Sequence, residues 1–212
     1  MIALLRPHGL LRESLRKLRG NPLGFGGLVI VIVIGVLTVF APLFATHAPN
    51  EVDVYARLQP PSGEHWLGTD QLGRDLYSRV LHGGRIAMTV SLVAISLSMA
   101  LGVALGMLAG FGPRWLDRLL LIGFDTVRSF PTVMFALAVV ALIGPSLNTV
   151  IGIVIITSVP AYARVVRTQT LALRERDFIL AERAMGASTW RILRHHVMPN
   201  IAAPLFILAS MD

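Results

Sequence analysis

The segment Leu180-Ala181-Glu182-Arg183-Ala184-Met185-Gly186, followed thirteen positions later by Pro199, lies in an arginine-rich stretch between two apolar runs. Its residues are compatible with a helix, and Gly186 allows the chain to turn sharply with a positive φ. Pro199 is expected to end a second short helix before the next apolar run. A charged loop of this kind, held between membrane-crossing runs, indicates a docking surface for a soluble partner.

The composition indicates a membrane protein. Hydrophobic residues make up 54% of the 212 residues and charged residues only 15%, and the mean hydropathy is +0.68, which ordinary soluble domains do not reach. A transmembrane helix needs roughly 20 apolar residues, and the ranges 23–45, 86–113 and 129–163 carry no charge. The third range is too long for one span, and Gly144-Pro145-Ser146 is expected to divide it into two helices.

Both ends of the chain bear on this interpretation. The first apolar run is longer than that of a cleaved signal peptide, so it is expected to remain as a span. The last run begins at Ile201 and reaches only Asp212, short of a full span. A terminal carboxylate in mid-bilayer is costly, so the sequence is expected to be a C-terminally truncated part of a longer chain. The sequence holds no cysteine, which excludes disulfides and thiolate metal sites.

The loop charges predict the orientation. Basic residues exceed acidic ones in 1–22 (net +4), 113–118 (net +1) and 164–198 (net +4), whereas 46–85 is net −1. Cytoplasmic loops of membrane proteins are enriched in Lys and Arg, so the first three segments are expected in the cytoplasm and the fourth outside. Because the basic residues flank membrane spans rather than one soluble face, nucleic-acid binding is not expected.

The loop around Gly186 resembles the cytoplasmic EAA loop of ATP-binding-cassette (ABC) importer permeases, E-A-A-x3-G-x9-I-x-L-P. Gly186 and Pro199 stand at the family spacing. When the pattern is aligned on Gly186, the Glu-Ala-Ala triplet corresponds to Leu180-Ala181-Glu182. The Ile and Leu of the pattern correspond to His196 and Met198, so the match is partial.

A longer resemblance lies in His65-Trp66-Leu67-Gly68-Thr69-Asp70-Gln71-Leu72-Gly73-Arg74-Asp75. This stretch is similar to the H-x-L-G-T-D-x-x-G-R-D sequence after the first span of C-type permease subunits in dipeptide, oligopeptide and nickel importers. The external motif residues are Gly68, Thr69, Asp70, Gly73, Arg74 and Asp75.

The resemblance implies an all-α fold, the helix bundle of type I (methionine-permease-like) ABC importer permeases, with about five of six transmembrane helices represented. It divides the chain into a cytoplasmic segment (1–22), a first transmembrane helix (23–45), an external connector (46–84) and an incomplete permease core (85–212). A cytoplasmic coupling loop spans 170–199. The implied location is the inner (plasma) membrane of a bacterial cell, with several membrane crossings and a cytoplasmic N-terminus.

The function implied is that of a non-catalytic permease subunit of an ATP-driven importer for di- or oligopeptides, while nickel, glutathione and opine importers share these motifs and stay open as alternatives. The implied partners are a B-type permease subunit, two ABC ATPase subunits, a periplasmic or lipid-anchored substrate-binding protein, and membrane lipid. No cofactor is expected, because the ATPase chains bind the ATP. The implied ATPase-coupling residues are Ala181, Glu182, Arg183, Ala184, Met185, Gly186, Ala187, Arg191 and Pro199.

The external motif also has a purely structural interpretation. Thr69 or Asp70 can cap a short helix, whose apolar stripe would be Leu72, Leu76, Val80 and Leu81. Such a helix would lie on the outer membrane surface. Contact with a substrate-delivering protein is the alternative. A calcium loop is not expected, because the alternating oxygen ligands and the final bidentate glutamate are missing.

Asp125 and Arg128 are the ionisable residues nearest an apolar segment, so they form a candidate gating or structural pair. In one helix over 116–143 they would be an i, i+3 ion pair near the cytoplasmic interface, with a kink at Pro131. His195-His196 do not form a metal site, because neighbouring helical residues point about 100° apart. No other pattern predicts a metal ligand set.

The second apolar run carries a small-residue face, with Gly102 and Gly106 in a G-x-x-x-G pattern that permits close helix packing. The pattern does not identify the partner helix. There is no Walker A loop or G-x-S-x-G motif, so an enzymatic activity is not expected. A stand-alone secondary transporter and a membrane scaffold are the alternatives from other functional classes.

Overall fold

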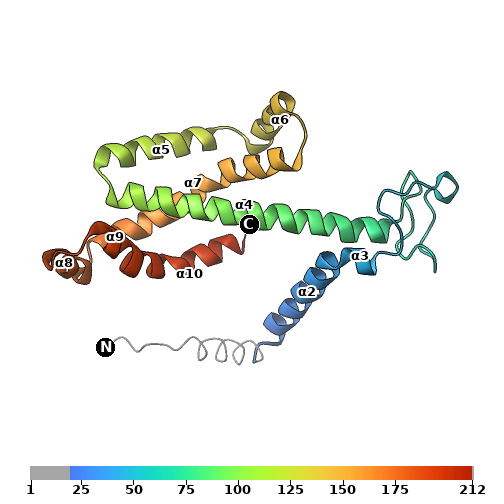
Figure 1. Cartoon of the computed structure of the whole chain (residues 1–212), viewed down its shortest axis with the longest axis horizontal. Helices are drawn as coiled ribbons and strands as arrows, with labels where there is room; N and C mark the ends of the chain where they lie inside the picture. Colours follow the sequence, from blue (N-terminus) through green and yellow to red (C-terminus); the bar gives the residue numbers. More distant parts are fainter. Residues whose placement is uncertain (1–19, 212) are drawn as a thin grey trace. The chain divides into compact units, whose positions relative to one another are not determined.

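The computed structural model describes residues 20–211. These residues form helices joined by turns, with no strand among them and a single isolated bridge between Thr69 and Asp75. The chain separates into two compact units, residues 1–88 and 89–212 (Figure 1). The N-terminal segment predicted to be cytoplasmic lies almost wholly outside the described residues, as does Asp212.

The first unit contains the first apolar helix and the connector. The side chain of Asn21 caps helix α2 (Pro22–Val39) by accepting a hydrogen bond from the Gly24 N–H at 3.2 Å. The predicted helix over 23–45 is interrupted at Phe40, after which Pro42 opens the single turn α3 (Ala41–Phe44). The connector then holds one 3₁₀ turn (Val54–Ala56) before helix α4 (Leu76–Phe111) begins.

The predicted short surface helix capped by Thr69 or Asp70 is wrong. The residue that caps a helix is Asp75, whose Oδ2 accepts the Ser78 N–H at 2.8 Å, and the helix then continues without interruption for 36 residues. Asp70 instead accepts the N–H groups of Leu72 and Arg74 at 2.8 and 3.1 Å. An aspartate used in this way closes a turn and does not start a helix.

Helix α2 packs against the beginning of α4 within the first unit. The hydroxyl of Thr38 lies 2.8 Å from the sulfur of Met88, and Thr38 is only 6% exposed. A Cβ at Gly84 would overlap the Thr38 methyl group, so glycine is needed for this approach.

In its described residues, the second unit contains the rest of α4, six further α-helices and one π-helical turn. In Figure 1, α5 and α7 run alongside α4, and α10 leads back from the end where α8 and α9 lie. Four helices of the described chain are long and apolar enough to cross a membrane, or five when the bent pair α5–α6 is counted as one span. The six α-helices that follow α4 are α5 (Arg114–Ser129), α6 (Thr132–Ile143), α7 (Leu147–Arg174), α8 (Asp177–Ala184), α9 (Thr189–Ile192) and α10 (Met198–Ala209).

One predicted break between helices is confirmed, and one predicted kink is instead a complete break. Helices α5 and α6 meet at Pro131 with a bend of 87°, which is a full break rather than the kink expected in one helix over 116–143. The charge-free run 129–163 is divided where Gly144-Pro145-Ser146 predicted it, since α6 ends at Ile143 and the Ser146 hydroxyl caps α7 by accepting the Thr149 N–H at 3.0 Å.

The small-residue face of α4 packs against α7. A Cβ placed on Gly106 would lie 2.6 Å from Cβ of Val166, and one on Gly110 would lie 2.7 Å from Cβ of Thr170. Real Cβ atoms do not approach so closely, so larger residues would push the helices apart. The structure confirms the predicted close-packing face and identifies α7 as the partner helix.

The predicted ion pair between Asp125 and Arg128 is wrong. Asp125 pairs with Arg164 of α7, and one turn of α7 further on, the guanidinium of Arg167 binds both carboxylate oxygens of Asp117, one of them at 2.7 Å. A bidentate Arg–carboxylate pair fixes both distance and orientation. The carboxylates of α5 therefore hold this helix against α7 rather than pairing within their own helix.

The expectation that Pro199 ends a helix is also wrong. Residues 189–209 form a continuous helical segment, in which a π-helical turn (Leu193–Val197) leads directly into α10. Proline lacks an N–H and clashes with the carbonyl four residues earlier in a regular α-helix. The wider π turn just before Pro199 relieves this conflict, so the chain passes from the loop into the membrane helix without a stop.

Candidate functional site

The predicted coupling segment is two short helices joined at Gly186. Gly186 has φ +84°, which confirms the predicted left-handed turn. Its N–H donates to the Arg183 carbonyl at 2.9 Å, and the next N–H, of Ala187, donates to the Glu182 carbonyl at 3.0 Å. This pair of bonds is a Schellman cap. It ends α8, and Ser188 then caps α9 through the Arg191 N–H at 3.4 Å.

One side of the segment is built into the core of the second unit. Ile179 of α8 is 0% exposed and Ile192 of α9 is 1% exposed. They pack in one cluster with Tyr162 and Val166 of α7 and with Val197. Because protein cores are closely packed and resist deformation, α8 cannot shift without displacing α7 or the π-helical turn that leads into α10.

Polar and aromatic contacts hold α8 from two further directions. The carboxylate of Glu182 lies 3.3 Å from Nε2 of His196 in the π turn. The guanidinium of Arg183 lies over the ring of Phe111, 4.9 Å from its centre, at the last residue of α4. Such a cation–π contact contributes about 0.5–1 kcal/mol at an exposed site. Arg183 is therefore engaged within the chain as well as exposed.

The opposite side of the segment presents large apolar side chains to solvent. Leu180 is 50% exposed, Met185 74% and Trp190 68%, while Arg191 is also exposed. Aromatic and methionine side chains are enriched in the cores of protein interfaces. A patch of this kind, carried on two short helices that are fixed from behind, fits a docking surface. Of the predicted coupling residues, Ala181, Ala184 and Pro199 are also exposed, and Ala187 packs partly against the core.

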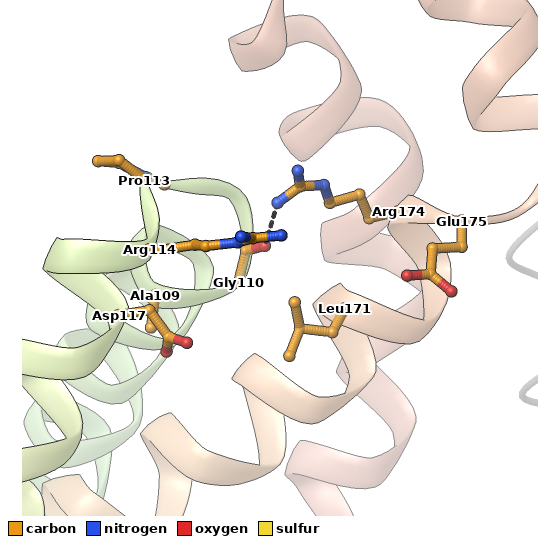
Figure 2. Close-up of a pocket in the computed structure, with 9 residues that line it drawn as sticks. Ala109, Gly110, Pro113, Arg114, Asp117, Leu171, Arg174 and Glu175 are labelled. Atoms are coloured by element: carbon orange, nitrogen blue, oxygen red, sulfur yellow. Dashed lines mark hydrogen bonds between the residues drawn. The ribbon is translucent and has the colours of Figure 1, made fainter.

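A charged pocket of about 410 Å³ lies beside this segment, where α4 ends, α5 begins and α7 ends (Figure 2). Arg174 donates to the Gly110 carbonyl across it at 3.3 Å, and Arg114, Asp117 and Glu175 also line it. The ends of three helices are thus connected by polar groups at the same end of the unit as α8.

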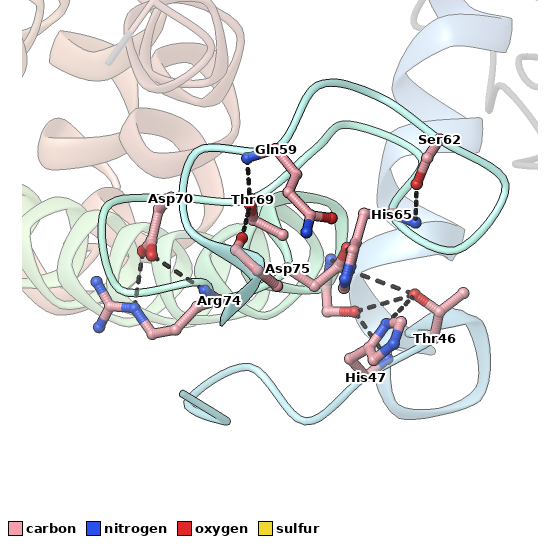
Figure 3. A network of polar contacts seen from close by, with 11 residues as sticks. Thr46, His47, Gln59, Ser62, His65, Thr69, Asp70, Arg74 and Asp75 are labelled. Atoms are coloured by element: carbon pink, nitrogen blue, oxygen red, sulfur yellow. Dashed lines mark hydrogen bonds and ion pairs between the residues drawn. The ribbon is translucent and has the colours of Figure 1, made fainter. Parts of the chain in front are cut away.

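The external motif lies in the first unit, where its polar side chains are used internally (Figure 3). The Thr69 hydroxyl donates to the Ala56 carbonyl and accepts the Gln59 N–H at 2.9 Å. Gly73 has φ +76°, and a side chain there would overlap the backbone of Asp53. Gly68 shares the positive φ. The motif therefore closes the connector on itself before α4 begins.

Two aspartates of the motif have lowered pKa values. Burial alone would raise the pKa of Asp70, but backbone N–H groups of Arg74 and Leu72 and the Arg74 guanidinium at 2.7 Å outweigh it, so the pKa is below 3.8. Burial would also raise the pKa of Asp75. Hydrogen bonds from the Ser78 N–H, the Ser78 hydroxyl and His65 outweigh this effect, so the pKa of Asp75 is lowered as well. Both carboxylates are charged at neutral pH.

Sequence reasoning missed several residues of these sites. His196, Phe111 and Trp190 contribute through contacts between distant segments, for which the sequence has no local signal. One signal did exist in the alignment itself, since His196 stands where the loop pattern has Ile. A polar residue at a position where the family pattern has an apolar one is expected to have a polar partner nearby. In the structure this partner of His196 is Glu182.

Comparisons with known proteins agree with this architecture. Residues 102–212 match the family described as binding-protein-dependent transport system inner membrane component. Residues 9–61 match the N-terminal transmembrane domain of oligopeptide transport permease C. The first match covers the part of the chain that contains α5 to α10 and the candidate coupling segment.

Three relatives illustrate the similarity. The dipeptide transport system permease protein DppC of Alkalihalophilus pseudofirmus is 38% identical over 94% of this chain and 66% of its own length. The probable D,D-dipeptide transport system permease protein DdpC of Escherichia coli is 36% identical over 92% of this chain and 65% of its own length. The glutathione transport system permease protein GsiD of Pectobacterium atrosepticum is 38% identical over 94% and 67%.

The chain thus spans about two thirds of the length of these relatives. No enzyme family is indicated, and the apolar helices agree with a multi-pass protein of the inner membrane. The chain belongs to the family of binding-protein-dependent transport system inner-membrane components, in the branch of the C-type dipeptide and oligopeptide permeases.

Proposed function

We propose that this chain is part of the transmembrane permease subunit of an ATP-driven importer of di- or oligopeptides. In this proposal a B-type permease subunit completes the pathway, two ABC ATPase subunits supply the energy, and a substrate-binding protein delivers the peptide from outside. The permease itself binds no nucleotide. The family membership supports the class of transporter, and the relatives named for dipeptide transport support the substrate.

The observation that carries the coupling role is the two-sided construction of α8 and α9. Their outer side exposes Leu180, Met185 and Trp190, whereas Ile179 and Ile192 on their inner side are buried in the core that contains α7 and α10. An ATPase bound to the outer side would therefore act on the membrane helices through close-packed contacts. Coupling requires that a movement of the ATPase outside the membrane is transmitted to the membrane helices. The packed contacts of α8 and α9 provide such a connection.

The orientation is part of the proposal. We place the N-terminus and the α8–α9 segment in the cytoplasm, where the ATPases are, and the connector with its external motif outside. The loop charges support this placement, because 164–198 is net +4 and 46–85 is net −1. In this proposal the ATPases and the substrate-binding protein approach the permease from opposite sides of the membrane, as import requires.

The relative named for glutathione transport gives the nearest alternative substrate. Glutathione is itself a small peptide, so both substrates need recognition of backbone amides and a terminal carboxylate. Uptake of labelled dipeptide and labelled glutathione by the reconstituted complex would separate them, since competition by the unlabelled compound identifies the better substrate.

Co-purification of the permease with its ATPase tests the coupling role. Trp190→Glu places a charge in the exposed patch, and removing an apolar anchor from the centre of an interface costs about 2 kcal/mol or more, so we expect at least about 30-fold weaker association. The matched control is Tyr55→Glu, because Tyr55 is a 97% exposed aromatic residue of the first unit. Equal association of both variants would contradict a docking role for α8–α9.

A further inference from the structure

Three residues of the connector, His47, Glu64 and His65, lie close together in the structure although His47 is distant from the other two in the sequence. His47 follows α3, and Glu64 and His65 lie 17 and 18 residues further on, yet each offers a ligand atom within 4.8 Å of the others. The imidazole rings of His47 and His65 are 4.7 Å apart between centres and tilted by 33° (Figure 3).

Both rings are oriented by hydrogen bonds through the same nitrogen. Nδ1 of His65 lies 3.1 Å from Oδ1 of Asp75, a carboxylate only 2% exposed. Nδ1 of His47 lies 3.0 Å from the Thr46 hydroxyl. A ring that donates its Nδ1–H in this way carries its lone pair on Nε2. Metal-binding histidines characteristically donate their second nitrogen to a carboxylate or another oxygen.

We propose that His47, Glu64 and His65 bind a divalent transition-metal ion, with zinc as the best match. Two neutral imidazoles and one carboxylate form a ligand set that zinc accepts in tetrahedral sites with a water in the fourth position. Calcium and magnesium prefer oxygen ligands throughout, so two imidazoles argue against them. The chain has no cysteine, so no thiolate competes for the ion.

The geometry requires a small closure around the ion. Tetrahedral zinc with bonds of about 2.0–2.1 Å holds its ligand atoms about 3.3 Å apart, less than the 4.8 Å limit within which these atoms lie. Glu64 can supply the movement, because it is exposed and no ion pair or hydrogen bond holds its carboxylate within the described chain. The site opens into a cavity of about 400 Å³ that Glu51 and Asp53 also line, which leaves room for water on the ion.

A bound ion would join the residue that follows the first membrane helix to the loop that precedes α4. Asp75 would connect this ion to the helix itself, since it orients His65 and also caps α4 through the Ser78 N–H. The site is therefore expected to close residues 48–63 of the connector as a loop whose opening breaks metal–ligand bonds.

Binding is measured on the full chain, purified in detergent without a polyhistidine tag and freed of metal by chelation. Equilibrium dialysis against Zn²⁺ should show one ion per chain, and Co²⁺ should give the visible absorption of a four- or five-coordinate site. Glu64→Gln, His47→Gln and His65→Gln should each weaken binding at least tenfold. Glu64→Gln alters an exposed side chain, so it tests the site without threatening the fold.

The matched control is His195→Gln, which removes an exposed imidazole of the second unit whose Nδ1–H donates to the Arg191 carbonyl at 3.2 Å. It should bind zinc like the unaltered chain. The proposal is overturned if the unaltered chain binds less than one ion at 100 µM Zn²⁺, or if Glu64→Gln and His47→Gln bind as tightly as His195→Gln.

Proteolysis gives a second readout that does not depend on transport. Trypsin can cut the connector after Arg57, an exposed residue between the proposed ligands. If opening breaks the site, Zn²⁺ at 100 times its Kd should slow this cleavage by up to about 100-fold. If a chain that binds one zinc ion is cleaved at the same rate with and without zinc, the ion is not bound in the connector and the proposal is overturned.

Discussion

The turn at Gly186 gives the sharpest test of how the coupling segment works. We predict that Gly186→Val leaves the permease in the membrane but weakens its association with the ATPase. Gly186 has φ +84°, and a Cβ there would meet no atom within 4 Å. The substitution therefore adds no clash with the rest of the chain, and its effect comes from backbone strain alone.

The magnitude follows from the backbone conformation. A non-glycine residue held in the left-handed region costs about 1–3 kcal/mol, and valine is among the worst because of its β-branch. The free permease can avoid this strain by giving up the Schellman bonds from Gly186 and Ala187. Docking would then have to restore the turn, so the association constant should fall about 5- to 150-fold, at 1.4 kcal/mol per factor of ten.

The assay is titration of the detergent-purified ATPase onto immobilised permease, with membrane abundance measured beside it. Gly186→Asn is the conservative comparison, because asparagine tolerates the left-handed region, and it should stay within about threefold of the unaltered chain. Gly144→Val is the matched control, since Gly144 has φ +97° and also no neighbour within 4 Å, but lies in the α6–α7 turn.

Three outcomes of this titration would contradict a role for the Gly186 turn in docking. If Gly144→Val weakens ATPase association as much as Gly186→Val, the effect is general destabilisation and not a displaced coupling segment. If Gly186→Asn is as defective as Gly186→Val, the side chain rather than the backbone conformation matters. If Gly186→Val binds normally, the turn is not needed for docking.

Helix packing, pH dependence and membrane orientation can each be tested on the same protein. Gly106→Ala should destabilise the protein by about 1–3 kcal/mol in thermal unfolding, because its Cβ would press on α7, whereas Gly152→Ala, with no neighbour within 4 Å, should be neutral or slightly stabilising. The pKa of Asp70 is lower in the folded protein than its ordinary value of 3.8. The interactions of the Asp70 carboxylate therefore stabilise the connector at pH 4 and above, and they are lost as the pH falls through the pKa that Asp70 has in the folded protein. Acid should therefore lower the hydrogen-exchange protection factors of the Leu72 and Arg74 amides, whose N–H groups Asp70 accepts, while Asp70→Asn should lower them already at pH 7. Introduced cysteines, Tyr55→Cys and Ser188→Cys, should be labelled by an impermeant reagent from opposite sides of the membrane, and labelling of both from one side would contradict the proposed orientation.

Much of the helical framework could be predicted because it depends on local properties. Charge-free runs identify membrane helices through the cost of burying charge, and Pro131 and Gly144-Pro145-Ser146 mark breaks through the backbone restrictions of proline and glycine. The positive φ of Gly186 was predictable for the same reason. In each of these cases the backbone restriction of one residue type matches the local conformation.

The failures come from interactions between distant segments. Asp125 was assigned to Arg128 because they lie three residues apart, but Arg164 reaches the same carboxylate from α7. Pro199 was expected to stop a helix, but the π turn before it accommodates the ring. The group of His47, Glu64 and His65 was invisible for the same reason, since only the folded connector brings residue 47 to residues 64 and 65.

The arrangement of α8 indicates how a force applied to it would be distributed. Ile179 packs against Tyr162 and Val166 of α7, and the guanidinium of Arg183 lies over the ring of Phe111 at the end of α4. Helices α4 and α7 are themselves in glycine-mediated contact at Gly106 and Gly110, where there is no free space for one to slide independently of the other. We infer that displacement of α8 moves α4 and α7 together as one body, with α5 carried along by its ion pairs to α7. Helix α6 lies beyond the 87° break at Pro131 but also packs against α7, so it is expected to move with the same body.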